Sequence, residues 1–195
     1  RPTAIAVNPL RRRIYWIEQE MSQAKLRSAY LDGDDIKTLV QDLGTVSGLI
    51  VDPFTDGRVY WSDMVAGYVE SVNATGGDRQ RVIYKGLHKP QSIDILWEDL
   101  YYGSEVLGAV YRHNKFGQGV NVSVAMGMIP PFALQLVHPL KQPSGEEFPP
   151  NGCQNAMCSF LCVTTDASSD GFKCLCSDNA TVIRDGGYRC NSNLA

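Results

Sequence analysis

The sequence predicts an all-β chain in which repeated antiparallel sheets are followed by one small, disulfide-rich module. Three observations predict this class. Strand-like segments with paired aromatic residues recur along residues 1–140, no useful length of chain has helical periodicity, and all six cysteines lie between Cys153 and Cys190. The 195 residues are 44% hydrophobic and 20% charged, which is an ordinary globular composition and excludes disordered and fibrous classes.

The repeat consists of an aliphatic strand, a polar turn and an aromatic strand. Its three copies carry Tyr15-Trp16, Tyr60-Trp61 and Tyr101-Tyr102. Their first tyrosines are 45 and 41 positions apart, and a period of about 40–45 residues is typical of four-stranded propeller blades. A β-sandwich whose strands are similar by chance is the alternative to blades.

Each copy continues with two further strands joined by a tight turn. Asp32-Gly33 and Gly76-Gly77 interrupt alternating segments, which is typical of β-hairpins. A shorter strand over 132–137 is expected to end the repeats. We therefore assign residues 1–140 to blades, the proline-rich residues 141–150 to a connector and residues 151–195 to the cysteine module.

Composition and motifs limit the function. A formal net charge of -3 gives no electrostatic case for nucleic acid, and the longest nearly uncharged run, 116–140, is broken by Pro130-Pro131. We expect this segment to have no membrane contact of its own. Strand-like sequence follows Arg1 directly, so we expect an internal piece of a longer protein.

The cysteine module predicts an oxidising, extracellular location, because a short segment buries too little apolar surface to hold itself together. Three N-glycosylation sequons, at Asn73, Asn121 and Asn179, agree with this location. Six cysteines allow fifteen pairings, and the sequence alone does not choose among them. No Cys-x2-Cys knuckle is present, so we expect no zinc site, and no cofactor is predicted.

The repeats resemble the Tyr-Trp-Thr-Asp (YWTD) repeats of the low-density lipoprotein receptor family. Residues 60–63 (Tyr-Trp-Ser-Asp) are one conservative step from the motif, residues 15–18 (Tyr-Trp-Ile-Glu) keep both aromatics and an acid, and 101–104 keep only the first tyrosine. Leu31-Asp32-Gly33 matches the family's turn. Family propellers have six blades and an adjoining EGF-like module. The resemblance therefore implies about three to four blades of a six-bladed propeller, from its C-terminal part, followed by an EGF-like domain.

The resemblance also implies how the cysteines pair: first with third, second with fourth, and fifth with sixth. That pattern gives Cys153–Cys162, Cys158–Cys174 and Cys176–Cys190 in this sequence. Calcium-binding members of the class carry an acidic motif before the first cysteine. Residues 148–152 lack it, so we expect a module without calcium.

The function implied is that of a non-enzymatic extracellular segment of a large endocytic receptor, exposed at the cell surface or in the endosomal lumen. It would space ligand-binding repeats and support the release of ligand in acid. Expected partners are lipoprotein or other endocytic cargo, the receptor's own ligand-binding repeats, and the remaining blades, which either precede Arg1 or belong to another chain. The alternatives are a direct protein-binding propeller of an adhesion protein or Wnt co-receptor, and a propeller hydrolase.

Individual side chains carry further expectations. His88, His113 and His138 are candidates for the acid response, because histidine titrates between neutral and endosomal pH; surface or structural roles are the alternative. The aromatic pairs are expected to pack between blades, and the resemblance makes Glu18 and Asp63 hydrogen-bond acceptors that link blades. The run 11–13 (Arg-Arg-Arg) is expected to be a solvated turn. Trp97 is expected to pack over a blade edge, with anchoring of a partner as the alternative.

Overall fold

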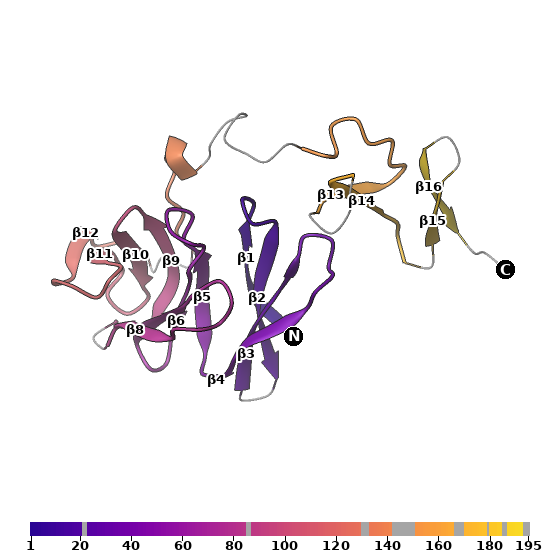
Figure 1. The fold of residues 1–195 in the computed structure, drawn as a ribbon. Helices are drawn as coiled ribbons and strands as arrows, with labels where there is room; N and C mark the ends of the chain where they lie inside the picture. The colour runs from indigo at the N-terminus through magenta and orange to yellow at the C-terminus, as the bar shows by residue number, and fades with distance from the viewer. Residues whose placement is uncertain are drawn as a thin grey trace.

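The computed structural model describes residues 1–20, 23–84, 87–129, 133–141, 151–165, 170–178, 180–184 and 187–192. Within these ranges the regular elements are antiparallel strands and one short 3-10 turn, η1 (Pro139–Lys141). The all-β class is therefore confirmed. Figure 1 shows the strands grouped into successive sheets, with the cysteine module at the other end of the chain.

Three four-stranded sheets follow one another along the chain, each in simple sequential order. Blade 1 contains β1 (Pro2–Asn8), β2 (Arg13–Glu20), β3 (Gln23–Tyr30) and β4 (Lys37–Leu43). Blade 2 contains β5 (Val46–Val51), β6 (Val59–Asp63), β7 (Tyr68–Val72) and β8 (Gln80–Ile83). Blade 3 contains β9 (Pro90–Leu96), β10 (Asp99–Ser104), β11 (Ala109–Asn114) and β12 (Val122–Ala125).

The expected strand over 132–137 is wrong for the part that the structure describes. Residues 133–138 form no strand, and the fourth strand of blade 3 is β12, where Ser123 pairs with Tyr111. A tight turn at Gly117 brings β12 back onto β11, so local hairpin closure completes the blade before residue 133 is reached.

Neighbouring blades share hydrophobic cores, and the alternation of side chains along a strand decides which core each residue enters. Tyr15 faces blade 2, and Trp61 of blade 2 faces back into the same cluster. Tyr60 faces forward into the next cluster, where it meets Tyr102 of blade 3. These four rings are at most 2% exposed, so the expected packing of the aromatic pairs between blades holds for them.

The two outer faces of the three-blade unit remain open. Ile5 and Val7 of β1 are 67% and 51% exposed, whereas Leu49 and Val51, at the same register in β5, are 9% and 5% exposed. Trp16 is half-buried although the equivalent Trp61 is buried. We call the side of blade 1 that carries Ile5, Val7 and Trp16 the first end face.

Blade 3 has the matching second end face, which carries Tyr101 and Val124. Val124 is 55% exposed, whereas Val82 at the equivalent position of β8 is 5% exposed because blade 3 covers it. Equivalent residues thus differ only in whether a further blade packs against them.

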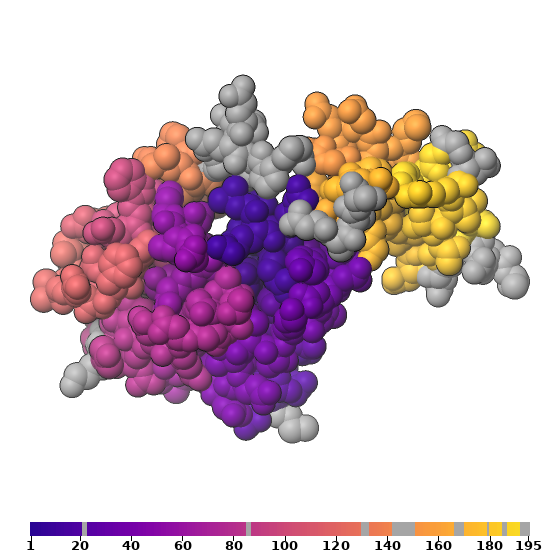
Figure 2. Space-filling model, viewed as in Figure 1, coloured from indigo at the N-terminus to yellow at the C-terminus, as the bar shows by residue number. Residues whose placement is uncertain are grey.

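The cysteine module consists of two hairpins, β13–β14 (Leu161–Thr164 and Phe172–Leu175) and β15–β16 (Ala180–Arg184 and Tyr188–Ser192). Disulfides join Cys153 to Cys162, Cys158 to Cys174 and Cys176 to Cys190, the pairing that the family pattern implies. The Lys173 ammonium lies 2.6 Å from the Asp34 carboxylate of blade 1. Figure 2 shows the module beside the indigo first blade.

Candidate functional site

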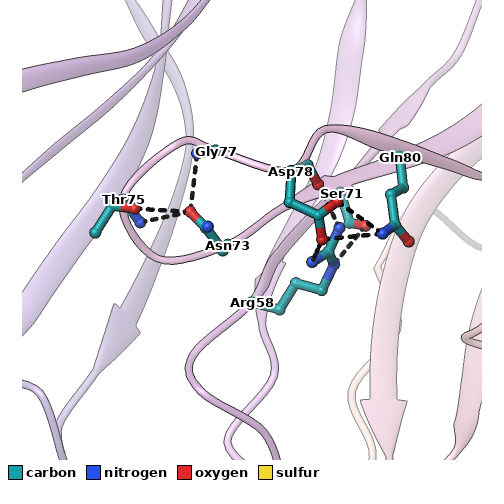
Figure 3. Close-up of polar contacts among 7 residues, drawn as sticks. All are labelled: Arg58, Ser71, Asn73, Thr75, Gly77, Asp78 and Gln80. Atoms are coloured by element: carbon teal, nitrogen blue, oxygen red, sulfur yellow. Dashed lines mark hydrogen bonds and ion pairs between the residues drawn. The ribbon is translucent and has the colours of Figure 1, made fainter.

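One face of the blades is built by turns that arginines hold closed. Antiparallel strands reverse direction, so the first and third turns of every blade leave at the same edge; we call this the turn face. In blade 2, Arg58 donates through Nε to Ser71 Oγ at 2.9 Å and through Nη1 to Asp78 Oδ2 at 2.8 Å. Gln80 donates to the same carboxylate (Figure 3).

The same arrangement, which we call the arginine clip, recurs in blade 1. Arg13 donates to Ser28 Oγ at 3.1 Å and to Asp35 Oδ2 at 3.0 Å. In both blades the aspartate has a positive φ, 56° for Asp35 and 51° for Asp78, which the short polar side chain tolerates.

Blade 3 reverses the charges. Asp99 occupies the register of Arg58, and Arg112 occupies that of Ser71; they pair at 3.2 Å. The sequence did not predict the clips, because the three partners lie on different strands and turns of a blade, and only their recurrence at a similar spacing could have indicated them. The expected solvated turn at 11–13 is correspondingly wrong in part: Arg13 is held in its clip, and Arg12 is buried.

The clips favour ionised carboxylates. Hydrogen bonds from Lys37 and then Arg13 hold the pKa of Asp35 below its ordinary value. Hydrogen bonds from Gln80 and then Arg58 do the same to the pKa of Asp78. Both groups therefore stay charged across the range from neutral to endosomal pH.

A buried ion pair joins blades 2 and 3. Lys115 Nζ lies 2.6 Å from Asp52 Oδ2, and the two side chains are 3% and 0% exposed. Asp52 also accepts from the Phe54 amide through Oδ1 at 2.9 Å. Asp52, rather than Glu18 or Asp63, is therefore a buried acid that links blades, and the more exposed Asp56–Arg11 pair joins blades 1 and 2.

Glu18 and Asp63 act within their own blades, so the expectation that they link blades is wrong. Glu18 accepts from Arg27 of the same sheet at 2.7 Å. Asp63 Oδ1 accepts from the Val65 and Ala66 amides at 2.9 and 2.7 Å, because it begins the turn that follows β6. The donor to Glu18 lies on the neighbouring strand β3, and the donors to Asp63 lie in the turn that Asp63 begins.

A second buried carboxylate ties down the segment that leaves the blades. Asp94 of β9 accepts from the Leu136 amide through Oδ2 at 2.7 Å and pairs with the Lys141 ammonium through Oδ1. The irregular segment 133–141 is therefore attached to an inner strand of blade 3.

The three candidate histidines lie apart. His88 is exposed between β8 and β9, and His113 is buried on β11, with Nδ1 2.8 Å from the Asn114 carbonyl oxygen. His138 Nδ1 accepts from the Leu140 amide at 3.2 Å, at the start of η1. The structure does not gather them into one cluster.

The sequons occupy different settings. Asn73 Oδ1 accepts from the Thr75 amide, the Thr75 hydroxyl and the Gly77 amide, which closes its turn (Figure 3). Asn121 is exposed at the start of β12. Asn179 lies outside the described residues, as do residues 142–150 of the expected connector.

Trp97 does not pack over the blade edge, so that expectation is wrong. Its side chain is 60% exposed and its φ is +57°. Trp97 lies in the two-residue turn between β9 and β10.

The described residues contain no group of three or more histidine, cysteine or acidic side chains placed to hold a metal ion. In the same part of the chain, no helix has the length and apolar character needed to cross a membrane.

Known proteins share this architecture. No model of a known protein family matches the chain. The chain is 28% identical over 186 residues to the vitellogenin receptor Yl of Drosophila melanogaster, which covers 94% of this chain and 9% of that receptor. It is 29% identical over 119 residues to the protein cueball of Drosophila sechellia, which covers 59% of this chain and 18% of cueball. The chain thus spans a small part of both relatives.

A solved structure of a nidogen/laminin complex has the same fold. It superposes with a TM-score of 0.56 and 25% identity, covering 65% of this chain and 47% of that chain.

Proposed function

We propose that this chain, whose repeats are the YWTD repeats of the low-density lipoprotein receptor family, is the extracellular part of an endocytic receptor that holds its ligand-binding repeats in place and helps to release ligand in acid. The family relationship rests on the vitellogenin receptor and cueball relatives and on the nidogen propeller. The coarser conclusion, an extracellular, receptor-type protein-binding domain, follows from the same relatives. One relative is a vitellogenin receptor and the structural neighbour is a nidogen/laminin complex, which supports a non-enzymatic role for this chain.

The observation that carries the proposal is that one continuous alignment to a receptor covers 94% of the chain, blades and cysteine module together. The Lys173–Asp34 ion pair joins the cysteine module to blade 1, as expected for a unit that holds neighbouring domains at a set spacing. A rigid spacer requires blades that do not move relative to one another. The buried Lys115–Asp52 pair joins blades 2 and 3 in this way.

The acid response is assigned to histidine, because the clip carboxylates stay charged at endosomal pH. His138 is the candidate with a defined contact: its Nδ1 accepts a backbone hydrogen bond, which a protonated ring would be unable to do. Protonation would therefore loosen η1, next to the start of the connector. The partners that respond would be the acidic ligand-binding repeats of the receptor.

Further blades are proposed to cover both end faces, since exposed Ile5, Val7 and Val124 have buried equivalents in blade 2. A contiguous apolar surface of this kind favours association. We also propose that Asn121 is glycosylated, because its side chain is exposed; Asn73 and Asn179 are the other sequons.

A chimeric receptor tests the proposal. The matching segment of the Drosophila melanogaster vitellogenin receptor is replaced by this chain, and uptake of fluorescent vitellogenin is measured in cultured cells. We expect uptake well above that of a receptor lacking the segment, with ligand released on acidification. Surface-expressed chimeras that take up or release no more ligand than the deletion would contradict the proposal. The triple variant of His88, His113 and His138 to glutamine is expected to retain ligand in acid.

Direct protein binding through the turn face is the second candidate. The nidogen neighbour, solved in complex with laminin, and the exposed Trp97 both favour it. Binding of ligand by the isolated chain at neutral pH would distinguish this function from a spacing role alone.

A further inference from the structure

Trp97 is displayed at a backbone cost. A bulky residue with φ near +57° occupies the left-handed region, which is sterically unfavourable for residues other than glycine. Two-residue hairpin turns usually place asparagine or glycine there. Here the residue is a tryptophan that is 60% exposed. Burial of its side chain in its own blade therefore does not offset the backbone strain. Strained backbone of this kind occurs preferentially at binding sites.

A second aromatic ring stands on the neighbouring turn. Asp99 pairs with Asn114 across β10 and β11, and the Lys115 amide donates to the Glu98 carbonyl oxygen at 2.7 Å. The two turns are therefore joined. Phe116, two residues beyond Asn114, is 57% exposed on this turn face.

Phe116 replaces polar residues at the same turn position in the other blades. The turns run Tyr-Leu-Asp-Gly over 30–33, Asn-Ala-Thr-Gly over 73–76 and Asn-Lys-Phe-Gly over 114–117, with Asp32 and Thr75 equivalent to Phe116. The aromatic pair is thus a property of blade 3, not of the repeat.

The turn that carries Phe116 is rigid. Lys115 is anchored by its ion pair with Asp52, and the Phe116 amide donates to Asn114 Oδ1 at 2.9 Å. Gly117 packs against the Val82 carbonyl oxygen of blade 2, where an added Cβ would lie 2.6 Å from it. Aromatic anchors held in advance lose little entropy on binding. Blade 2 therefore supplies the Asp52 and Val82 contacts that hold this turn.

The acidic side chain next to Trp97 is unpaired among the residues that the structure describes. Within the described part of the chain, Glu98 is exposed and its carboxylate has no hydrogen bond or ion pair, whereas Asp99 pairs with Arg112 and Asp56 with Arg11. The Lys115 ammonium already lies 5.4 Å from the Phe116 ring centroid. Among the same residues no cation lies over the Trp97 ring, so that ring and Glu98 are open to a cation from outside.

We propose that Trp97, Glu98 and Phe116, together the Trp97 patch, bind an extended protein segment that presents a lysine or arginine side chain. The cation would stack on the indole and pair with Glu98, while apolar parts of the segment contact Phe116. This proposal rests on the proposed function as a protein-binding domain and names the chemistry of its partner.

Peptides that differ only in charge test it. The probes are fluorescein-labelled (Lys-Pro)4, (Gln-Pro)4 and (Glu-Pro)4, which share an extended polyproline conformation. Fluorescence anisotropy with the full 195-residue chain is expected to give the order Lys, Gln, Glu in affinity, with at least about a threefold step from Lys to Gln.

Three variants locate the binding. Glu98→Gln is expected to lower the affinity for the Lys peptide to that for the Gln peptide. The affinity for the Gln peptide is expected to stay unchanged. Trp97→Asn keeps a residue suited to the left-handed turn, and Phe116→Thr introduces the residue that blade 2 has at this position. Each variant is expected to lower the affinity for the Lys and the Gln peptide by about tenfold. Asp56→Asn, which removes another exposed acid of the turn face, serves as the matched control and is expected to bind as the unaltered chain does.

Equal binding of the Lys and Gln peptides overturns the proposal, as does Lys-peptide binding that Trp97→Asn leaves within twofold, or no binding of any peptide at 1 mM. Circular dichroism of each variant shows whether the blades are folded. A failed chimeric receptor leaves this result standing, because anisotropy measures binding by the chain without endocytosis.

Discussion

Lys115 shows how much one buried side chain contributes to the joining of blades. Its ammonium is the partner of Asp52, whose carboxylate is fully buried. Removing one member of a buried pair leaves the other charged and unsolvated, which costs far more than the pair itself contributes.

We therefore expect Lys115→Ala to lower the free energy of unfolding by about 3–5 kcal/mol. Urea unfolding followed by circular dichroism measures the change. Lys25→Ala is the matched control, since Lys25 pairs with Glu20 on the surface, where solvent screens the pair, and its loss is expected to change the free energy of unfolding far less. Similar losses in the two variants would show that the Lys115 pair is solvated.

The arginine clips are expected to make the stability of the fold depend on pH only at pH values near or below the ordinary aspartate pKa. Because the folded pKa values of Asp35 and Asp78 are depressed, their stabilisation is fully present above the unfolded value of about 3.9 and is lost as the pH falls through the folded values. We expect the clips to cause no change in Tm between pH 7.4 and 5.5.

Thermal unfolding over a pH series checks this prediction, with the Arg13→Gln, Arg58→Gln double variant as the comparison. The unaltered chain is expected to lose the advantage over this variant only below about pH 4. A difference between the two that shrinks already between pH 7 and 5.5 would mean that the clips take part in the endosomal response.

At the scale of elements, the turn between the third and fourth strands of blades 2 and 3 also contacts the blade before it. Gly76 and Gly117 have positive φ and approach the carbonyl oxygens of Leu39 and Val82, whereas Gly33 has positive φ and open space. The three glycines thus separate the cost of backbone strain from the cost of losing an interblade contact.

Gly33→Ala is expected to cost only the strain, about 1 kcal/mol, and Gly117→Ala clearly more, because its Cβ would lie 2.6 Å from the Val82 carbonyl oxygen. Chemical unfolding of both variants measures the difference. Equal losses would indicate that the blade 2 to blade 3 contact yields freely. In a chain extended by a preceding blade, we expect Gly33→Ala to become as costly as Gly117→Ala.

For the whole molecule, the dominant feature is a stack of three blades with two exposed apolar end faces. Blade 1 presents Ile5, Val7 and Trp16 on the first end face, and blade 3 presents Tyr101 and Val124 on the second. A surface of this kind binds apolar probes and associates.

We expect the 195-residue chain to bind a hydrophobic dye and to associate at high concentration. Ile5→Lys with Val7→Lys is expected to reduce both, since charges on the first end face oppose its burial. Dye fluorescence and light scattering provide the measurements, with Val65→Lys, at an exposed turn away from the end faces, as the control. If the Ile5→Lys, Val7→Lys variant bound the dye normally and the Val65→Lys control did not, the dye-binding apolar surface would not be the first end face.

Periodicity and residue type predicted most of the fold because they act locally. The spacing of Tyr15, Tyr60 and Tyr101 indicated blades, and alternation indicated that the aromatic pairs would be buried, as four of the rings are. The strand over 132–137 was wrong because a closer hairpin partner, β12, was available. The prediction that Trp97 packs over the blade edge was wrong, because the burial of a side chain in a turn depends on the three-dimensional course of that turn. Periodicity in the sequence carries no information about this course.

By itself, the sequence determined the all-β class, the repeat and the likeness to YWTD receptors, since strand propensity, turn residues and cysteine spacing are properties of short segments. Only the tertiary structure decided that Asp52 rather than Asp63 links blades, that Arg58 meets Asp78, and that the turns carrying Trp97 and Phe116 are joined. Those contacts join residues that are distant along the chain. Strand register and blade packing fix their distances, and neither quantity can be read from one segment alone.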